Sequence, residues 1–254
     1  MKLDCVLTAC NSNPLYYNFI PIFIRAWNKL YPTVDVKIIY IDSHIPDFLQ
    51  EYKDNIILFE PIKNVSDAFI SQYIRLLYPA ILNYDNGILI TDMDILPMNR
   101  TYYTKTIESF PNNKFIYLRD ALLKDENQIA MCYNVATNKT WEEIFDIHSL
   151  EDINKRLIQV NSRVTYINGS GNSGWFTDQL DLYSHVMEWN KKTNNFVSLP
   201  DNTTGFNRLD RINNINLADI NVRNAITEGK YTDYHCLRPY GQYKLITDNI
   251  VFLL

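Results

Sequence analysis

The sequence predicts an α/β domain with a mostly parallel, Rossmann-like central sheet that helices flank. Short apolar runs of β type alternate with amphipathic helical patterns in the first half of the chain, the order typical of a parallel sheet with crossover helices. The run 88–91 is continuously apolar up to its last residue, as expected of a strand buried on both faces. A length of 254 residues, 46% of them hydrophobic, suits one large domain or a core domain with insertions.

The first half of the chain contains the most regular patterns. The predicted strands are 3–9, 36–41, 56–59 and 88–91. An aromatic, amphipathic helix is expected over 15–30, with a kink at Pro21. Ser66 is suited to be the N-cap of a second helix, which carries one apolar stripe and should be kinked or shortened by Pro79.

The second half is less regular. Strands are expected at 114–118 and 129–135, and helical stretches within 141–160 and 180–189. The segment 201–224 is polar and is predicted to be mostly loop. No repeat or disordered linker interrupts the chain, so we expect one domain.

Composition narrows the function classes. The net charge is -5, the pI is near 5.4 and no basic run occurs, so nucleic acid and anionic membrane surfaces are not expected partners. The four cysteines form no Cys-x-x-Cys pair, which favours reduced thiols and a cytoplasmic location. The first strand begins at Leu3, and no apolar run is long enough for a bilayer, so neither signal peptide nor transmembrane segment is expected.

Two further compositional features are informative. The bias toward Asn, Ile, Lys and Tyr is typical of an AT-rich genome such as a viral one, in which case the location is the host cytoplasm. Only 7 glycines are present, and neither the Gly-x-Gly-x-x-Gly fingerprint nor a P-loop occurs. A standard dinucleotide fold and a P-loop are therefore both disfavoured.

Two carboxylates, Asp92 and Asp94, follow the buried strand 88–91 directly. In an extended chain they share one face, at the strand end where parallel sheets bind ligands. Such a pair can hold Mg²⁺ or Mn²⁺ and leave coordination positions open for diphosphate oxygens. The alternative is an acidic turn that caps the next segment.

A second candidate region follows a cluster of three glycines. Asp178 and Gln179 lie just beyond Trp175, an arrangement that suits sugar recognition because aromatic faces cover C–H surfaces while Asp and Gln bind hydroxyls. The alternative is that Thr177 or Asp178 only caps the following helix.

His235 and Arg238 lie near the C-terminus. A neutral imidazole at His235 would complete a mixed site with the two aspartates and shift its preference toward Mn²⁺. Arg238 could neutralise a phosphate through bidentate hydrogen bonds. Lone histidines are more often surface or satisfied core residues, and that alternative stays open.

The first-half elements offer further candidates. Arg75 lies off the apolar stripe of the helix that leads into the strand 88–91, where it could reach a diphosphate or a sugar, or could simply be solvated. The loop after the first strand should border the same crevice, with Tyr16 or Tyr17 available to stack on a base. Its candidate nucleobase-pocket residues are Thr8, Ala9, Cys10 and Asn11.

These motifs together resemble the GT-A fold glycosyltransferases, and more closely the glycogenin and lipopolysaccharide-galactosyltransferase type. They occur in order as Arg75 with Pro79, Asp92-Met93-Asp94, Asp178-Gln179, and His235 with Pro239. The resemblance implies a UDP-sugar or similar nucleotide-sugar donor and a glycan or glycoprotein acceptor. It implies Mn²⁺ (or Mg²⁺) bound by Asp92, Asp94 and His235, with Asp178 and Gln179 beside the transferred sugar. It also implies a single domain over 1–254, in which 1–100 bind the nucleotide and 101–254 bind the acceptor and supply the last metal ligand.

The sequence departs from this family near its C-terminus. The family pattern His-x-x-Gly-x-x-Lys-Pro-Trp is here reduced to the segment 233–240, and its diphosphate-binding lysine is missing. Arg238 is the candidate replacement. Retention of configuration fits the Asp-Gln signature better, whereas an inverting enzyme would use Asp178 as the base that deprotonates the acceptor.

Three rival functions stay open. A haloacid-dehalogenase-type phosphatase also uses Asp-x-Asp after a strand, but usually near the chain start and with Thr or Val where this sequence has Leu96. A nucleotidyltransferase would need a Gly-rich, basic N-terminal loop, which is absent. The non-enzymatic rival is a module that binds a sugar nucleotide or glycan without turnover.

Overall fold

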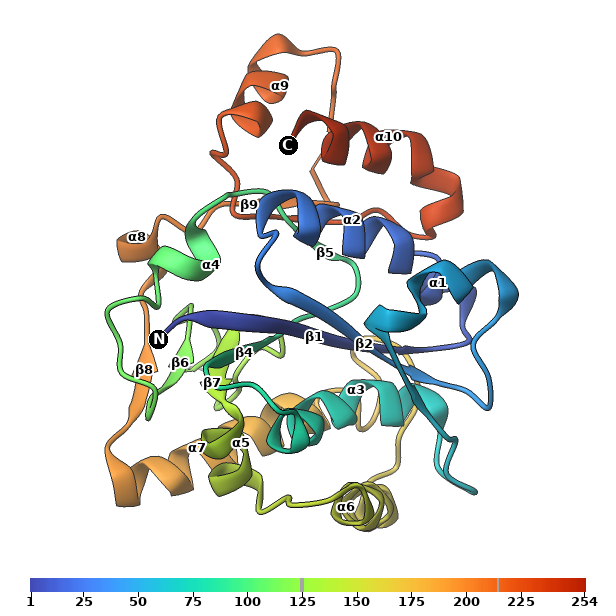
Figure 1. Cartoon of the computed structure of the whole chain (residues 1–254), viewed down its shortest axis with the longest axis vertical. Helices are drawn as coiled ribbons and strands as arrows, with labels where there is room; N and C mark the ends of the chain where they lie inside the picture. The colour runs from blue at the N-terminus through green and yellow to red at the C-terminus, as the bar shows by residue number, and fades with distance from the viewer. Residues whose placement is uncertain (124–125, 214) are drawn as a thin grey trace.

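The computed structural model describes residues 1–123, 126–213 and 215–254. Its centre is a seven-stranded sheet of order β3-β2-β1-β4-β7-β6-β8, with helices on both faces (Figure 1). The strands are β1 (Leu3–Asn11), β2 (Asp35–Ile41), β3 (Ile56–Phe59), β4 (Gly87–Ile90), β6 (Phe115–Tyr117), β7 (Asn134–Thr137) and β8 (Phe196–Ser198). The first four run parallel to one another, β7 runs antiparallel to both of its neighbours, and β8 is parallel to β6. The predicted mixed α/β class with a mostly parallel sheet is confirmed.

Helices form a layer on each side of the sheet. In Figure 1, α2 (Ile20–Leu30) and α10 (Tyr240–Leu253) lie on one side, and the larger group lies on the other. That group is α3 (Asp67–Leu77), α5 (Asn138–Phe145), α6 (Leu150–Arg163) and α7 (Thr177–Thr193). The short helices are α1 (Pro14–Tyr17), α4 (Tyr102–Lys105), α8 (Asp201–Thr204) and α9 (Ile220–Thr227), and 3₁₀ segments span Asp47–Asn55 and Tyr78–Ile81. Within the described ranges, no helix combines the length and apolarity that crossing a membrane requires.

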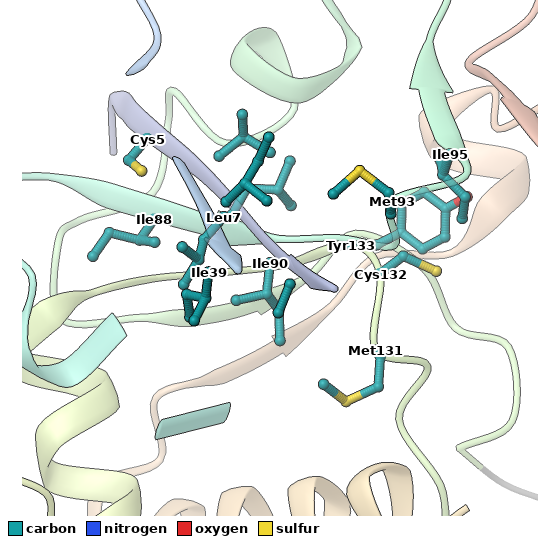
Figure 2. Close-up of a cluster of buried hydrophobic side chains, with 14 of the residues drawn as sticks. Cys5, Leu7, Ile39, Ile88, Ile90, Met93, Ile95, Met131, Cys132 and Tyr133 are labelled. Atoms are coloured by element: carbon teal, nitrogen blue, oxygen red, sulfur yellow. The ribbon is translucent and has the colours of Figure 1, made fainter. Parts of the chain in front are cut away.

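The core lies between these two layers. Ile88, Leu89 and Ile90 of β4 are fully buried, as their uninterrupted apolar pattern predicts. Figure 2 shows side chains of β1, β2 and β4 packed together, with a second group beyond the carboxyl end of β4. The labelled residues are Cys5, Leu7, Ile39, Ile88 and Ile90, then Met93, Ile95, Met131, Cys132 and Tyr133. Burial of each large apolar side chain stabilises the fold by about 1.5–3 kcal/mol, so this packing holds the carboxyl end of β4 in a fixed position.

Pro21 and Pro79, the two prolines that were expected to kink helices, both lie at helix ends. The helix predicted over 15–30 is divided into α1 and α2, and Pro21 occupies the first turn of α2, where no intrahelical N–H is needed. At the second helix, α3 ends at Leu77, and Pro79 lies in the 3₁₀ turn that follows. Ser66 is at the N-cap position of α3, as expected, although its side chain makes no capping hydrogen bond.

The segment 129–135 differs most from expectation. Only 134–137 pair as a strand, because the backbone of Tyr133 turns through a positive φ of 83° and the side-chain amide of Asn134 donates to the carbonyl of Ala130. Residues 129–133 are still apolar and buried, apart from a partly exposed Ala130. The apolar pattern of 129–133 therefore reflects burial and does not indicate a paired strand. The polar segment 201–224 also differs, since it contains α8, a strand and the start of α9.

That strand belongs to a second, three-stranded sheet that positions the site. It consists of β5 (Ile95–Pro97), β10 (Asp233–His235) and β9 (Arg208–Asp210), in the order β5-β10-β9. In its register, His235 lies opposite Ile95 on one side and Asp210 on the other. The sheet thereby carries the C-terminal histidine to the residue that follows Asp94.

Candidate active site

A cavity of about 220 Å³ opens at the carboxyl ends of β1 and β4. Seven of the predicted site residues line it: Ala9, Cys10, Asn11, Arg75, Asp92, Asp94 and Arg238. The remaining lining comes mainly from α1, α3 and the segment between α6 and α7, and includes Tyr16, Tyr166 and Trp175. The topology thus brings residues from both halves of the chain around one space, at the edge where parallel sheets bind ligands.

Asp92 and Asp94 reach the cavity through a turn. β4 ends at Ile90, and the amide of Ile95 donates to the carbonyl of Asp92 at 3.2 Å. The predicted alternation along an extended chain therefore does not apply here, and the two carboxylates have different partners. Both nevertheless line the cavity.

Arg75 joins three segments of the site. Its side chain is 7% exposed, and its Nη1 donates to the carbonyl of Thr91 at 3.0 Å and to the carboxylate of Asp92. Its Nη2 lies 3.6 Å from Oδ2 of Asp178. Arg75 is therefore buried and paired, and the alternative that it is a solvated helix arginine is wrong. Burial acts to raise the pKa of Asp92, but Arg75 lowers it below the usual value.

Asp178 lies in the first turn of α7 and is almost fully buried. Burial raises its pKa to about 7, although Arg75 opposes the shift. Its Oδ1 accepts a hydrogen bond from the amide of Gln179 at 2.9 Å, and the N-cap position belongs to Phe176. Neither Asp178 nor Gln179 is among the residues that line the cavity, so Asp178 is connected to it through Arg75.

Asp94 has the densest electrostatic environment of the site. Its Oδ2 lies 2.9 Å from Nη1 of Arg211, 3.3 Å from Nε of Arg238 and 3.7 Å from Nε2 of His235. Its side chain is only 8% exposed. Arg238 is held on its other side by Tyr16, whose hydroxyl accepts from Nη1 at 2.6 Å.

His235 is held between two carboxylates. Its Nδ1 lies 3.3 Å from Oδ2 of Asp210, while Nε2 faces Asp94. When Nδ1 carries the proton and donates it to Asp210, the Nε2 lone pair faces Asp94. This arrangement is the one that commonly orients a metal-binding histidine.

The donor types at this edge fit a divalent cation, since two carboxylates and an imidazole suit Mn²⁺. Across residues 1–123, 126–213 and 215–254, however, no three Asp, Glu, His or Cys side chains converge closely enough to hold an ion. Asp92 is instead bonded to Arg75, and Asp94 to Arg211 and Arg238. The metal site of Asp92, Asp94 and His235 therefore stays a prediction.

The residues proposed for the nucleobase pocket are divided. Ala9, Cys10 and Asn11 line the cavity, whereas Thr8 is fully buried beneath them. Of the two tyrosines, Tyr16 lines the cavity, and Tyr17 packs against Phe48 with ring centroids 5.3 Å apart.

Sequence reasoning missed Arg211, Asp210 and Tyr166. The first two lie in the segment predicted to be loop, where the alternating charges of Arg208, Asp210 and Arg211 were the only available signal. Tyr166 precedes the glycine cluster, and its buried hydroxyl has no hydrogen-bond partner in the described parts of the chain. A lone tyrosine in such a loop gives no pattern to detect.

No family model and no curated protein matches the sequence. Among solved structures, the galactosyltransferase LgtC in complex with donor and acceptor sugar analogues is similar, with a TM-score of 0.52 and 11% identity over 98% of this chain and 96% of that one. An active-site mutant of LgtC gives a TM-score of 0.51 and 13% identity over 98% and 94%. The glycosyltransferase GlyE of Streptococcus pneumoniae TIGR4 gives 0.46 and 16% over 79% and 46%. At such low identity, the likeness to LgtC shows a shared fold, and it confirms the predicted GT-A architecture.

Proposed function

We propose that this protein is a glycosyltransferase that moves a sugar from a nucleotide diphosphate donor, a UDP-sugar, to a glycan or protein-linked acceptor. One observation carries the proposal. Arg75, Arg211 and Arg238 meet Asp92 and Asp94 in one cavity at the carboxyl edge of the sheet, in a fold shared with a galactosyltransferase. A cavity with this mixture of charges suits a diphosphate, because the arginines can bind it in the donor and stabilise it as the leaving group after the sugar has been transferred.

The arginines of the cavity are suited to the leaving group. Breaking the bond between sugar and phosphate leaves additional negative charge on the diphosphate, and preorganised guanidinium groups stabilise such charge. Arg238 replaces the missing family lysine in this role. Its packing against Tyr16, with the guanidinium carbon 5.4 Å from the ring centroid, restricts it to the cavity.

We also propose Asp92, Asp94 and His235 as ligands of Mn²⁺, or of Mg²⁺. The ion would act as a Lewis acid that neutralises the departing diphosphate. The protein's own contribution is orientation, because Asp210 fixes the His235 ring with Nε2 toward Asp94.

The surroundings of Asp178 support a retaining reaction. A base that deprotonates an acceptor must contact its hydroxyl, whereas Asp178 is 4% exposed and is paired with Arg75. Because neither residue lines the cavity, we propose that Asp178 and Gln179 support the positively charged sugar of the transition state without contact: the Asp178 carboxylate supplies negative charge, and the Gln179 backbone amide holds that carboxylate in place. Tyr166 and Trp175 supply aromatic surface for a sugar ring.

Calorimetric titration of UDP and then GDP, with and without Mn²⁺, tests the proposal on the native protein and on Asp94→Asn. We expect UDP binding to require Mn²⁺, and the variant to weaken it by at least about 10-fold, because a carboxylate ligand is lost. Equal binding to both proteins, or no binding of either nucleotide, contradicts the proposal. Product analysis with Mn²⁺ then separates the rivals: a transferase releases nucleoside diphosphate from the donor, a phosphatase releases inorganic phosphate from phosphomonoesters, and a binding module releases neither.

Asp210→Ala should weaken Mn²⁺ binding by about 10- to 100-fold, because the His235 ring loses the carboxylate that orients it. The measurement is titration of Mn²⁺ followed by the electron paramagnetic resonance signal of the free ion. Asp54→Ala is the control, since it removes one exposed carboxylate elsewhere on the surface. Unchanged affinity in Asp210→Ala would remove Asp210 from the site.

A further inference from the structure

Arg211 occupies an unusual place in the site. It follows β9 directly, lines the cavity, and points Nη1 at Oδ2 of Asp94 from 2.9 Å. Its side chain is 27% exposed, so one part of it contacts solvent while the other pairs with a nearly buried carboxylate.

The contacts of Asp94 oppose the binding of a cation. Arg211, Arg238 and His235 all converge on the single oxygen Oδ2. A divalent cation on either oxygen of this carboxylate would lie close to the two guanidinium groups, which repel it. The departure of one arginine therefore strengthens binding of the ion.

Arg211 is the arginine that is free to leave. Arg238 has a second anchor in the hydroxyl and ring of Tyr16. Arg211 has no hydrogen bond or ion pair besides Asp94 among the residues that the structure describes. Because Arg211 already lines the cavity, a change of its side-chain rotamer would be enough to carry its guanidinium group from Asp94 to a ligand there.

We infer that Arg211 is a built-in substitute for the cation: it neutralises Asp94 in the cation-free protein, and it transfers to the donor's diphosphate when a divalent cation takes its place. The inference rests on the proposed function and deepens it. It makes Arg211 a donor-binding residue and couples the two ligands. The cation frees an arginine for the nucleotide, and the nucleotide removes the arginine that competes with the cation, so each ligand strengthens binding of the other by the same factor.

The inference predicts effects of opposite sign in one variant. In Arg211→Ala, Mn²⁺ alone should bind about 5- to 10-fold more tightly, because its competitor is gone. UDP at saturating Mn²⁺ should bind about 10-fold more weakly, because a charged hydrogen-bond donor is lost. Mn²⁺ binding is followed by electron paramagnetic resonance and UDP binding by calorimetry, so neither readout depends on turnover.

Two further variants complete the design. Arg211→Gln keeps most of the side-chain volume without the charge and should reproduce both shifts if Arg211→Ala disturbs the fold. Arg223→Ala removes an exposed arginine of α9 and should change neither affinity. Two results would overturn the inference while leaving the proposed function intact. One is that both Arg211 variants bind Mn²⁺ more weakly than the native protein in the absence of UDP. The other is that both variants bind Mn²⁺ and UDP with unchanged affinity. Absence of Mn²⁺ and UDP binding to the native protein overturns both.

Discussion

Arg75→Ala should lower the free energy of unfolding by about 3–5 kcal/mol, because it removes the positive partner of two carboxylates at once. Asp178 would then be a nearly buried acid without its counter-ion, and Thr91 would lose a hydrogen-bond donor to its carbonyl. Urea unfolding at pH 8 measures the change. We expect sugar transfer to be lost even under conditions in which the variant stays folded, because Asp92 loses the contact that fixes it.

The control is Arg163→Ala. Arg163 also pairs with an aspartate, Asp181, but its side chain is 54% exposed, so the loss should stay below about 1 kcal/mol. The double variant Arg75→Ala/Asp178→Asn should recover part of the stability, since it neutralises the acid that the single variant leaves without a partner. If the losses from Arg75→Ala and Asp178→Asn simply add, Arg75 is not the counter-ion of Asp178.

In the cation-free protein, stability should decrease as the pH rises from 5 to 8, and Asp178→Asn should remove much of this decrease. Burial raises the pKa of Asp178 from 3.8 to about 7. The folded state therefore holds this proton more tightly than the unfolded state does. The resulting stabilisation is fully present below about pH 4 and is lost as the pH rises through about 7.

The expected difference between the two proteins over this range is about 2 kcal/mol. Urea unfolding in the presence of a chelator, at pH 5, 6, 7 and 8, measures it. The comparison between native protein and variant cancels the histidines and the other groups that titrate in this window. Parallel curves for the two proteins would show that Asp178 is ionised throughout, as its partner Arg75 alone would favour.

Much of the fold could be read from local pattern. The four parallel strands β1 to β4 were predicted within about two residues at each end, because apolar runs of strand length between turn signals are set by neighbouring residues. Arg75 could be named as a candidate because it lies off the apolar stripe of the helix that leads into the strand before Asp92. The same reasoning gave a wrong strand for most of the segment 129–135, because an apolar run indicates burial whether or not its backbone pairs with a strand.

The candidate site likewise combines features that local pattern predicts with contacts that it does not predict. Local pattern alone places two aspartates directly after a buried strand, at the edge where parallel sheets bind ligands, and a histidine and an arginine near the C-terminus. The folded chain was needed to show that Arg211 contacts Asp94 across 117 residues of sequence, that Asp210 holds His235, and that Arg75 joins Asp92 to Asp178. The physical reason is that strand and helix patterns arise from contacts within a few residues. The charge around a buried carboxylate depends instead on which distant strands pair, and here the β5-β10-β9 sheet brings them together.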